Sequence, residues 1–259
     1  MTTPLQGGRG YVLAQADDAA PAPTLYLYDV LGVDMFGGVL AKQVIDDLRA
    51  LGDVPELAVR INSPGGDVFE GIAVYNAVAR FPANVTVHID GIAASAATLV
   101  AMAGNRIAIA ENAMVMVHRP WTALMGDAPE LRRQAEILDK AWSSMLTTYQ
   151  RRTGRRAATV EQKVASAGGE WWMTAAEAVA EGFADVVTKP EKEAQVFGLH
   201  RFRHVPAQLA ASAAGASAAE SPAAPRIAEI APPRVEASVR DVMPLAQRRR
   251  IVEALRLAT

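Results

Sequence analysis

Residues 88–104, HIDGIAASAATLVAMAG, decide the fold, because nearly all their side chains are small or apolar while Ser95 carries a hydroxyl in the middle. A strand pattern at residues 84–90, NVTVHID, leads into this stretch, and the Ala-rich run after Ser95 fits a helix. We therefore predict a strand, a bend at Gly91 and a helix with Ser95 at its N-terminus. Unpaired N–H groups and the helix dipole favour negative charge there. A serine in this place is also a common helix cap.

Strand and helix patterns alternate on both sides of this stretch. The sequence predicts helices at 37–52 and 68–81 and strands at 24–32, 56–62, 105–110 and 113–118. Alternation at this pitch indicates βαβ units, and therefore an α/β fold with a largely parallel sheet covered by helices. Sites in such folds usually lie at the carboxyl ends of the strands.

A long amphipathic helix is expected at residues 127–154. Apolar residues recur there at steps of four and three, namely Leu131, Ala135, Leu138, Trp142, Met145 and Tyr149. Pro129 suits the first turn of this helix, and Gly154 suits its end. The stripe either covers the helix's own sheet or extends beyond one core to pack on another subunit.

Composition divides the chain into three parts. Residues 1–23 read as a flexible leader, residues 24–190 as the folded domain, and residues 191–259 as an Ala/Pro-rich tail that lacks large core residues. The end of the tail, residues 241–259, is expected to form a short basic helix. That helix is either a solvated terminus or a docking segment for an assembly partner.

Charge and residue content exclude several classes of function. With 26 basic and 28 acidic residues, the chain has a net charge of −2 and no overall field that would attract nucleic acid or an anionic membrane. It has no Cys, which excludes disulfides, thiolate catalysis and Cys-ligated zinc. No signal peptide and no apolar run of about 20 residues is seen. We expect a soluble, cytoplasmic protein with no nucleic-acid or membrane partner.

A nucleophilic Ser95 needs a base, and the chain has four histidines. His118 ends an apolar strand pattern at the same edge of the predicted sheet as Ser95, which is where a general base belongs. His88 lies inside a strand pattern and reads as a structural residue. His200 and His204 have the spacing of a metal pair, but Arg stands where a metalloprotease carries its Glu, so no metal site is expected.

Two glycines provide a further element of this chemistry. Gly65 and Gly66 directly follow a predicted strand, where a backbone without Cβ can turn its N–H into a cleft. The N–H groups of Gly66 and Ala96 are therefore candidates for an oxyanion hole beside Ser95. Pro-Gly-Gly is also an ordinary turn, so this motif gains meaning only next to Ser95 and His118.

Four segments in this order resemble the ClpP family of serine peptidases and, more closely, its phage branch, the head maturation (prohead) proteases. They are residues 61–78, 91–108, 114–120 and 172–185, and the similarity runs from about Thr24 to Val187. The resemblance implies a ClpP/crotonase-like spiral of ββα units and a Ser-His-acid triad that needs no cofactor. It also implies homo-oligomeric rings, heptamers or stacked rings, in which the long helix is the handle that joins ring to ring.

The resemblance assigns roles residue by residue. Ser95 falls on the nucleophile, His118 on the base, and Gly66 and Ala96 on the two oxyanion amides. The acid falls on Glu170, where Clp enzymes usually carry Asp; a Glu can also accept the ring N–H and stabilise imidazolium. Asp185 is the fallback for the acid.

The expected function is therefore serine endopeptidase, cleaving capsid or scaffold proteins during phage head maturation in the host cytoplasm. One alternative is the proteolytic subunit of an ATP-dependent Clp protease that works with an AAA+ unfoldase. A second is a catalytically inactive scaffold or shell protein. A crotonase-type acyl-CoA enzyme is disfavoured, because such enzymes need no Ser-His pair.

Overall fold

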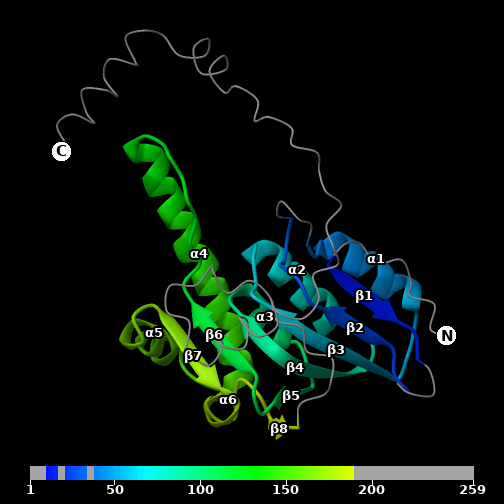
Figure 1. Ribbon diagram of the computed structural model, residues 1–259. Helices are drawn as coiled ribbons and strands as arrows, with labels where there is room; N and C mark the ends of the chain where they lie inside the picture. The colour runs from blue at the N-terminus through cyan, green and yellow to red at the C-terminus, as the bar shows by residue number, and fades with distance from the viewer. Residues whose placement is uncertain (1–9, 17–20, 34–37, 190–259) are drawn as a thin grey trace, which may run out of the picture. The chain divides into compact units, whose positions relative to one another are not determined.

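The structure, a computed structural model, describes residues 10–16, 21–33 and 38–189. These residues form one mixed sheet with the strand order β1-β2-β3-β4-β5-β8, and β6 pairs with both β4 and β7. The strands are β1 Tyr11–Ala14, β2 Thr24–Leu27, β3 Glu56–Ser63, β4 Asn84–Ala94, β5 Arg106–Ala110, β6 Met114–His118, β7 Glu170–Thr174 and β8 Val186–Thr188. The pairs β1/β2 and β6/β7 are antiparallel and the others are parallel. The α/β class and the largely parallel sheet are confirmed (Figure 1).

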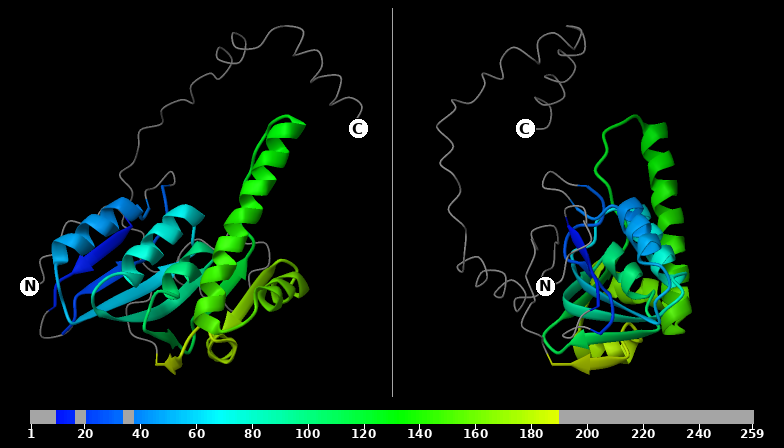
Figure 2. Two further views of the ribbon diagram at one scale, coloured as in Figure 1. Left: turned by 180° about the vertical axis from the view of Figure 1, so that it is seen from behind. Right: turned by 90° about the vertical axis from the view of Figure 1, so that its right-hand side faces the viewer.

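Helices cover one face of the sheet (Figure 2). Helix α1 (Ala41–Leu51) buries Ala41, Val44 and Leu48, and helix α2 (Val68–Ala79) buries Val74 and Val78. The short helix α3 (Ala96–Ala101) is buried along its whole length. Strand β3 alternates a buried residue with a half-exposed one at residues 57–60, and β4 does so at residues 85–88, whereas β5 is buried from Ile107 to Ala110.

Helix α4 (Ala128–Thr153) is the predicted long helix, and its ends have the expected chemistry. Asp127 and Glu130 form a capping box at the start, and Gly154 ends the helix in the left-handed conformation. One face of its C-terminal half is buried, with Trp142 and Tyr149 in the core, whereas Leu131 in its N-terminal half is 45% exposed. In Figure 1 this N-terminal half extends away from the sheet. Helices α5 (Ala157–Ser166) and α6 (Ala175–Glu181) complete the described elements.

Two sequence-based expectations about the chain's course need correction. The fold does not begin at Thr24, because Tyr11–Ala14 pairs with β2, Tyr11 and Leu13 are buried, and the Tyr11 hydroxyl donates to Asp47 of α1 at 2.7 Å. The prediction of a flexible leader at residues 1–23 is therefore wrong at β1. This strand of four residues is too short to give a periodic pattern. Strand β4 also continues through Gly91 to Ala94 instead of bending there. The predicted tail, 191–259, lies outside the described residues.

Searching the described helices for one long and apolar enough to cross a membrane finds no candidate.

Candidate active site

Ser95 lies at the junction of β4 and α3 in an unusual backbone conformation. Its φ of 53° and ψ of −127° make it the one non-glycine residue with positive φ in the described part of the chain. A non-glycine residue in this region is strained and persists only when its surroundings hold it. The Ser95 N–H donates to Met116 O at 2.8 Å, and its side chain makes no capping hydrogen bond to α3. The hydroxyl is therefore available for another partner.

That partner is His118. The distance between Ser95 Oγ and His118 Nε2 is 2.7 Å, a hydrogen bond of ordinary length between two groups 23 residues apart. The contact depends on sheet topology, because β4 pairs with β6 only over Ile92–Ala94 and Met114–Met116, immediately before the two side chains. The strand ends predicted to meet do meet.

Glu170 begins β7 and stands directly opposite His118 in the antiparallel β6/β7 ladder. Both side chains are buried, His118 at 7% and Glu170 at 9% exposure. Burial lowers the pKa of His118 below its usual value, while the negative charge of Glu170 acts in the opposite direction. The imidazole is therefore neutral near pH 7, as a proton acceptor must be, and it has an anion beside it that favours its protonated form.

Asp185, the alternative acid, is engaged elsewhere. Its carboxylate accepts the Ile107 N–H at 2.6 Å and a hydrogen bond from Arg152. Burial raises the pKa of Asp185, but these hydrogen bonds outweigh that effect and keep it below its usual value. It joins α4, β5 and the segment before β8, which is a structural role.

The glycine turn after β3 packs against Ser95. A Cβ on Gly65 would lie 2.5 Å from Ala94 O and 2.8 Å from both Ala96 N and Ser95 Cβ, so only glycine fits. Ser63, which sequence analysis did not single out, orients this turn: its hydroxyl donates to Asp29 O at 2.6 Å and accepts the Gly65 N–H at 3.1 Å. No local pattern marks this role, because Asp29 is 34 residues away.

The two predicted oxyanion amides border the same space. Ala96 is the first residue of α3, so its N–H has no acceptor within the helix. Gly66 has φ of 147°, and a Cβ there would overlap Leu31 O at 2.1 Å. Within the described residues, neither N–H is used in a backbone hydrogen bond of the turn.

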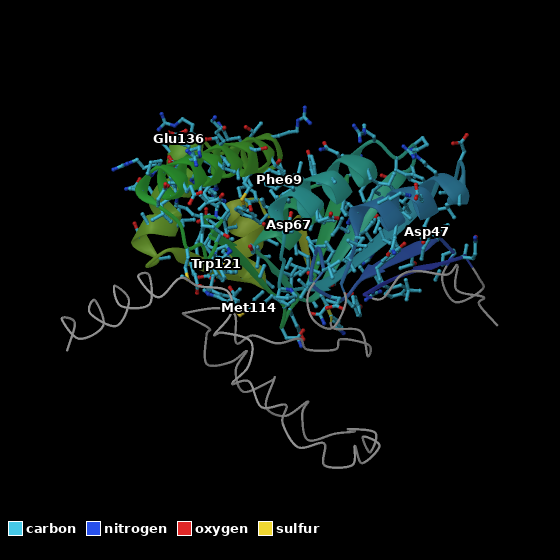
Figure 3. All side chains as sticks on the ribbon, turned by 90° about the horizontal axis from the view of Figure 1, so that it is seen from above. Asp47, Asp67, Phe69, Met114, Trp121 and Glu136 are labelled. Carbon is cyan, nitrogen blue, oxygen red and sulfur yellow. The ribbon has the colours of Figure 1, made fainter. Side chains whose placement is uncertain are left out.

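A cleft of about 590 Å³ opens at Ser95 and His118. Asp67 and Phe69 at the start of α2 border it, as does Trp121 after β6 (Figure 3). Phe69 is 59% exposed and Trp121 is 65% exposed, so the rim presents large apolar surfaces to an incoming chain. The arrangement fits an extended ligand laid across the serine.

The remaining histidines do not join this site. His88 lies within β4, paired with Arg60 and Ala108 in the neighbouring strands, while His200 and His204 lie outside the described residues. Across the described ranges, no group of three His, Cys, Asp or Glu side chains could hold a metal ion.

Comparison with known proteins agrees with this geometry. Among curated relatives, the chain is 32% identical over 132 residues to ATP-dependent Clp protease proteolytic subunit 1 of Leifsonia xyli, covering 50% of this chain and 66% of that protein. It is 30% identical over 138 residues to the subunit 1 of Protochlamydia amoebophila, covering 51% and 65%. It is 28% identical over 141 residues to the Clp proteolytic subunit of Porphyromonas gingivalis, covering 53% and 62%. The chain thus spans just under two thirds of the length of each.

Structural similarity points to the same fold. A ClpP1 mutant from Listeria monocytogenes superimposes with a TM-score of 0.55 at 19% identity, covering 64% of this chain and 91% of that one. Residues 34–191, which include every predicted site residue, match the family described as Clp protease. The chain therefore belongs to the Clp protease family.

Proposed function

We propose that this protein is a serine endopeptidase that works by acyl transfer through Ser95, His118 and Glu170. The observation that carries the proposal is the 2.7 Å hydrogen bond between Ser95 Oγ and His118 Nε2. A serine hydroxyl is a weak nucleophile unless a base lies within hydrogen-bond reach, and this base is buried and neutral. Membership of the Clp protease family supports the same chemistry.

In the proposed reaction, His118 Nε2 takes the proton of Ser95 Oγ as the oxygen attacks the peptide carbonyl. The N–H groups of Gly66 and Ala96 stabilise the resulting oxyanion. His118, its positive charge stabilised by Glu170, then gives its proton to the leaving amine. Water attacks the acyl-enzyme, again with His118 as base, and Ser95 regains its proton.

We further propose that the protein acts as a homo-oligomeric ring. The N-terminal half of α4 supports this, because Leu131 and Ile137 are 45% and 46% exposed on a helix whose other half buries one face in the core. A second subunit packed on this half would cover them, in keeping with the handle role that the family resemblance implies.

For the substrate, we propose capsid or scaffold proteins of a phage head, as the closer resemblance to the prohead branch suggests. The second candidate, a proteolytic subunit fed by an ATP-driven AAA+ unfoldase, is favoured by the names of the curated relatives, which are ATP-dependent Clp proteolytic subunits. An inactive scaffold is the third, and it is disfavoured by the formed Ser95–His118 contact.

Two experiments test these proposals. A fluorophosphonate probe should label Ser95 in the assembled parent protein and not in Ser95→Ala, and an unlabelled parent would remove the enzyme proposal. Incubation of the purified protein with a purified candidate scaffold or capsid protein should give cleavage without added ATP. Breakdown of unrelated proteins that requires an unfoldase and ATP would instead support the second candidate.

A further inference from the structure

The Ser95 carbonyl accepts two hydrogen bonds from a buried threonine, Thr98. It accepts the Thr98 N–H at 3.0 Å and the Thr98 hydroxyl at 2.5 Å. Thr98 is fully buried in α3, although apolar side chains surround it. A buried hydroxyl is unfavourable unless its hydrogen bonds are made, so these contacts define the carbonyl's position sharply.

Tyr149 of α4 extends this contact into a chain. Its hydroxyl lies 2.7 Å from Thr98 Oγ1, and Tyr149 is also fully buried. Thr98 has a single hydroxyl proton, and the carbonyl of Ser95 can only accept, so that proton goes to Ser95 O. Tyr149 is then the donor to Thr98, and burial, which raises the pKa of Tyr149, keeps its proton in place. The chain runs from Tyr149 to Thr98 to Ser95 O.

Fixing this carbonyl also fixes the N–H of Ala96. The Ser95 C=O and the Ala96 N–H belong to one planar trans peptide unit, in which the two groups point in opposite directions. With the carbonyl turned back toward Thr98, the N–H is turned away from it. The Ala96 N atom lies 2.8 Å from the position that a Cβ on Gly65 would take, so it borders the glycine turn of the cleft.

This peptide orientation is strained at Ser95, so the contacts that hold it matter. At φ 53° and ψ −127°, Ser95 has the conformation of the first central residue of a type II′ turn, which favours glycine. Rotating the Ser95–Ala96 peptide by about half a turn would bring ψ of Ser95 close to the left-handed helical region, which non-glycine residues tolerate better. The same rotation would make φ of Ala96 positive, so it would move the strain from Ser95 to Ala96 and would not remove it. That rotation would point the carbonyl into the cleft and the N–H away from it.

We propose that Thr98 and Tyr149 are positioning residues that hold the Ser95–Ala96 peptide so that the Ala96 N–H serves the oxyanion. The inference rests on the proposed acyl-transfer function. Neither side chain touches the reacting atoms; Thr98 acts through the Ser95 carbonyl, and Tyr149 acts through Thr98.

The test removes the hydroxyls one at a time in the full-length assembled protein. Turnover of p-nitrophenyl acetate gives kcat, KM and their pH dependence. Thr98→Val should lower kcat about 10- to 100-fold, somewhat less than the loss of an entire oxyanion donor. KM and the acid limb of the pH profile should not move, because Thr98 touches neither the ligand cleft nor His118. Tyr149→Phe should lower kcat less, since Thr98 still donates to Ser95 O.

Three controls separate positioning from folding. Thr98→Ser keeps the hydroxyl and should restore most of kcat, whereas Thr24→Val removes a buried threonine hydroxyl in β2, far from the cleft, and should leave kcat unchanged. Where Thr98→Val fails to fold because it leaves the Tyr149 hydroxyl unpaired, Thr98→Val combined with Tyr149→Phe removes both groups. The combined variant should show the loss of about 10- to 100-fold in kcat that is expected of Thr98→Val.

A crystal structure of Thr98→Val supplies a readout that does not depend on activity. The expected result is a Ser95 carbonyl displaced from its parent position, since only the residue 98 N–H still donates to it. An unmoved peptide with an undiminished kcat overturns the inference. Equal loss in Thr98→Ser and Thr98→Val also overturns it, because Thr98→Ser keeps the hydroxyl and the hydroxyl would then not be what matters. If the parent turns over no faster than Ser95→Ala, the proposed function fails. The crystal structure of Thr98→Val then decides alone whether Thr98 and Tyr149 hold the Ser95–Ala96 peptide in place.

Discussion

Substitution of Gly65 by Ala tests how closely the glycine turn must approach the nucleophile. Gly65 has φ of +86°, and an added Cβ would meet Ala94 O at 2.5 Å and both Ala96 N and Ser95 Cβ at 2.8 Å. None of these atoms is the movable end of a flexible side chain. The turn and the β4–α3 junction must therefore move apart, which separates the two proposed oxyanion donors, the N–H groups of Gly66 and Ala96.

The structure allows the size of this effect to be worked out. A non-glycine residue at positive φ costs about 1–2 kcal/mol, and overpacking of a tight site adds about 1–3 kcal/mol. The expected loss in the free energy of unfolding is therefore about 2–5 kcal/mol. Relief of the closest overlap requires a shift of about 0.9 Å, the difference between 3.4 Å for ordinary contact and 2.5 Å. A displacement of that size at a reacting centre lowers kcat/KM about 100-fold.

Gly154 provides the matched control. It has φ of +70° at the end of α4, and a Cβ there would meet nothing within 4 Å. Gly154→Ala should therefore cost only the backbone contribution of about 1–2 kcal/mol and leave kcat/KM unchanged. Urea unfolding and p-nitrophenyl acetate turnover measure the two quantities for both variants. Equal stability losses in the two variants, or a Gly65→Ala variant as active as the parent, would refute the steric reasoning.

Three further predictions concern other parts of the domain. Glu170→Gln should lower kcat by about 10²- to 10⁴-fold and move the acid limb of the kcat/KM profile to lower pH, because the lost negative charge had raised the pKa of His118; an upward movement would contradict the assigned acid. Arg60→Met should lower the free energy of unfolding by about 3–5 kcal/mol in urea, because the buried carboxylate of Asp90 then loses the guanidinium that pairs with it. A loss below about 1 kcal/mol would contradict this. Leu131→Glu should shift the oligomer toward smaller species in analytical ultracentrifugation with little change in protomer stability; an unchanged oligomer would argue against the α4 contact.

The contacts that sequence analysis predicted are those encoded by short motifs at strand ends. Ser95 and His118 each end a clear strand pattern, and strand ends at one edge of a parallel sheet meet by topology. Glu170 required the family resemblance, because nothing in residues 168–174 alone indicates an antiparallel pairing with β6. The ladder places it opposite His118.

Contacts between distant, chemically ordinary residues could not be predicted. Thr98 and Tyr149 are 51 residues apart, and each fits an apolar helix pattern in which the hydroxyl has no visible purpose. The buried ion pair of Arg60 and Asp90 likewise sits at positions where strand alternation predicts half-exposed side chains. Periodicity predicts which face a residue lies on, but the partner on that face depends on the register of a neighbouring strand.

Gly91, where a bend was expected, lies in a bulge of β4 that determines where Ser95 is placed. Between the pairs Ile61–Ile89 and Ser63–Ala93, β3 advances two residues while β4 advances four, so β4 bulges there. Asn62 Oδ1 accepts the Ile92 N–H at 3.2 Å, and a Cβ on Gly91 would lie 2.7 Å from that oxygen. Glycine at position 91 thus leaves room for the Asn62 side chain, which accepts a hydrogen bond from the bulged backbone.

The bulge determines which strand β4 meets next. Before it, β4 pairs with β5 over Thr86–Ile89, and after it β4 pairs with β6 over Ile92–Ala94. A true bend at Gly91 would have ended β4 beside β5, whose last residue is Ala110, and would have left Ser95 away from His118. Because the strand changes partner instead of stopping, it delivers Ser95 to the one neighbouring strand that ends in histidine.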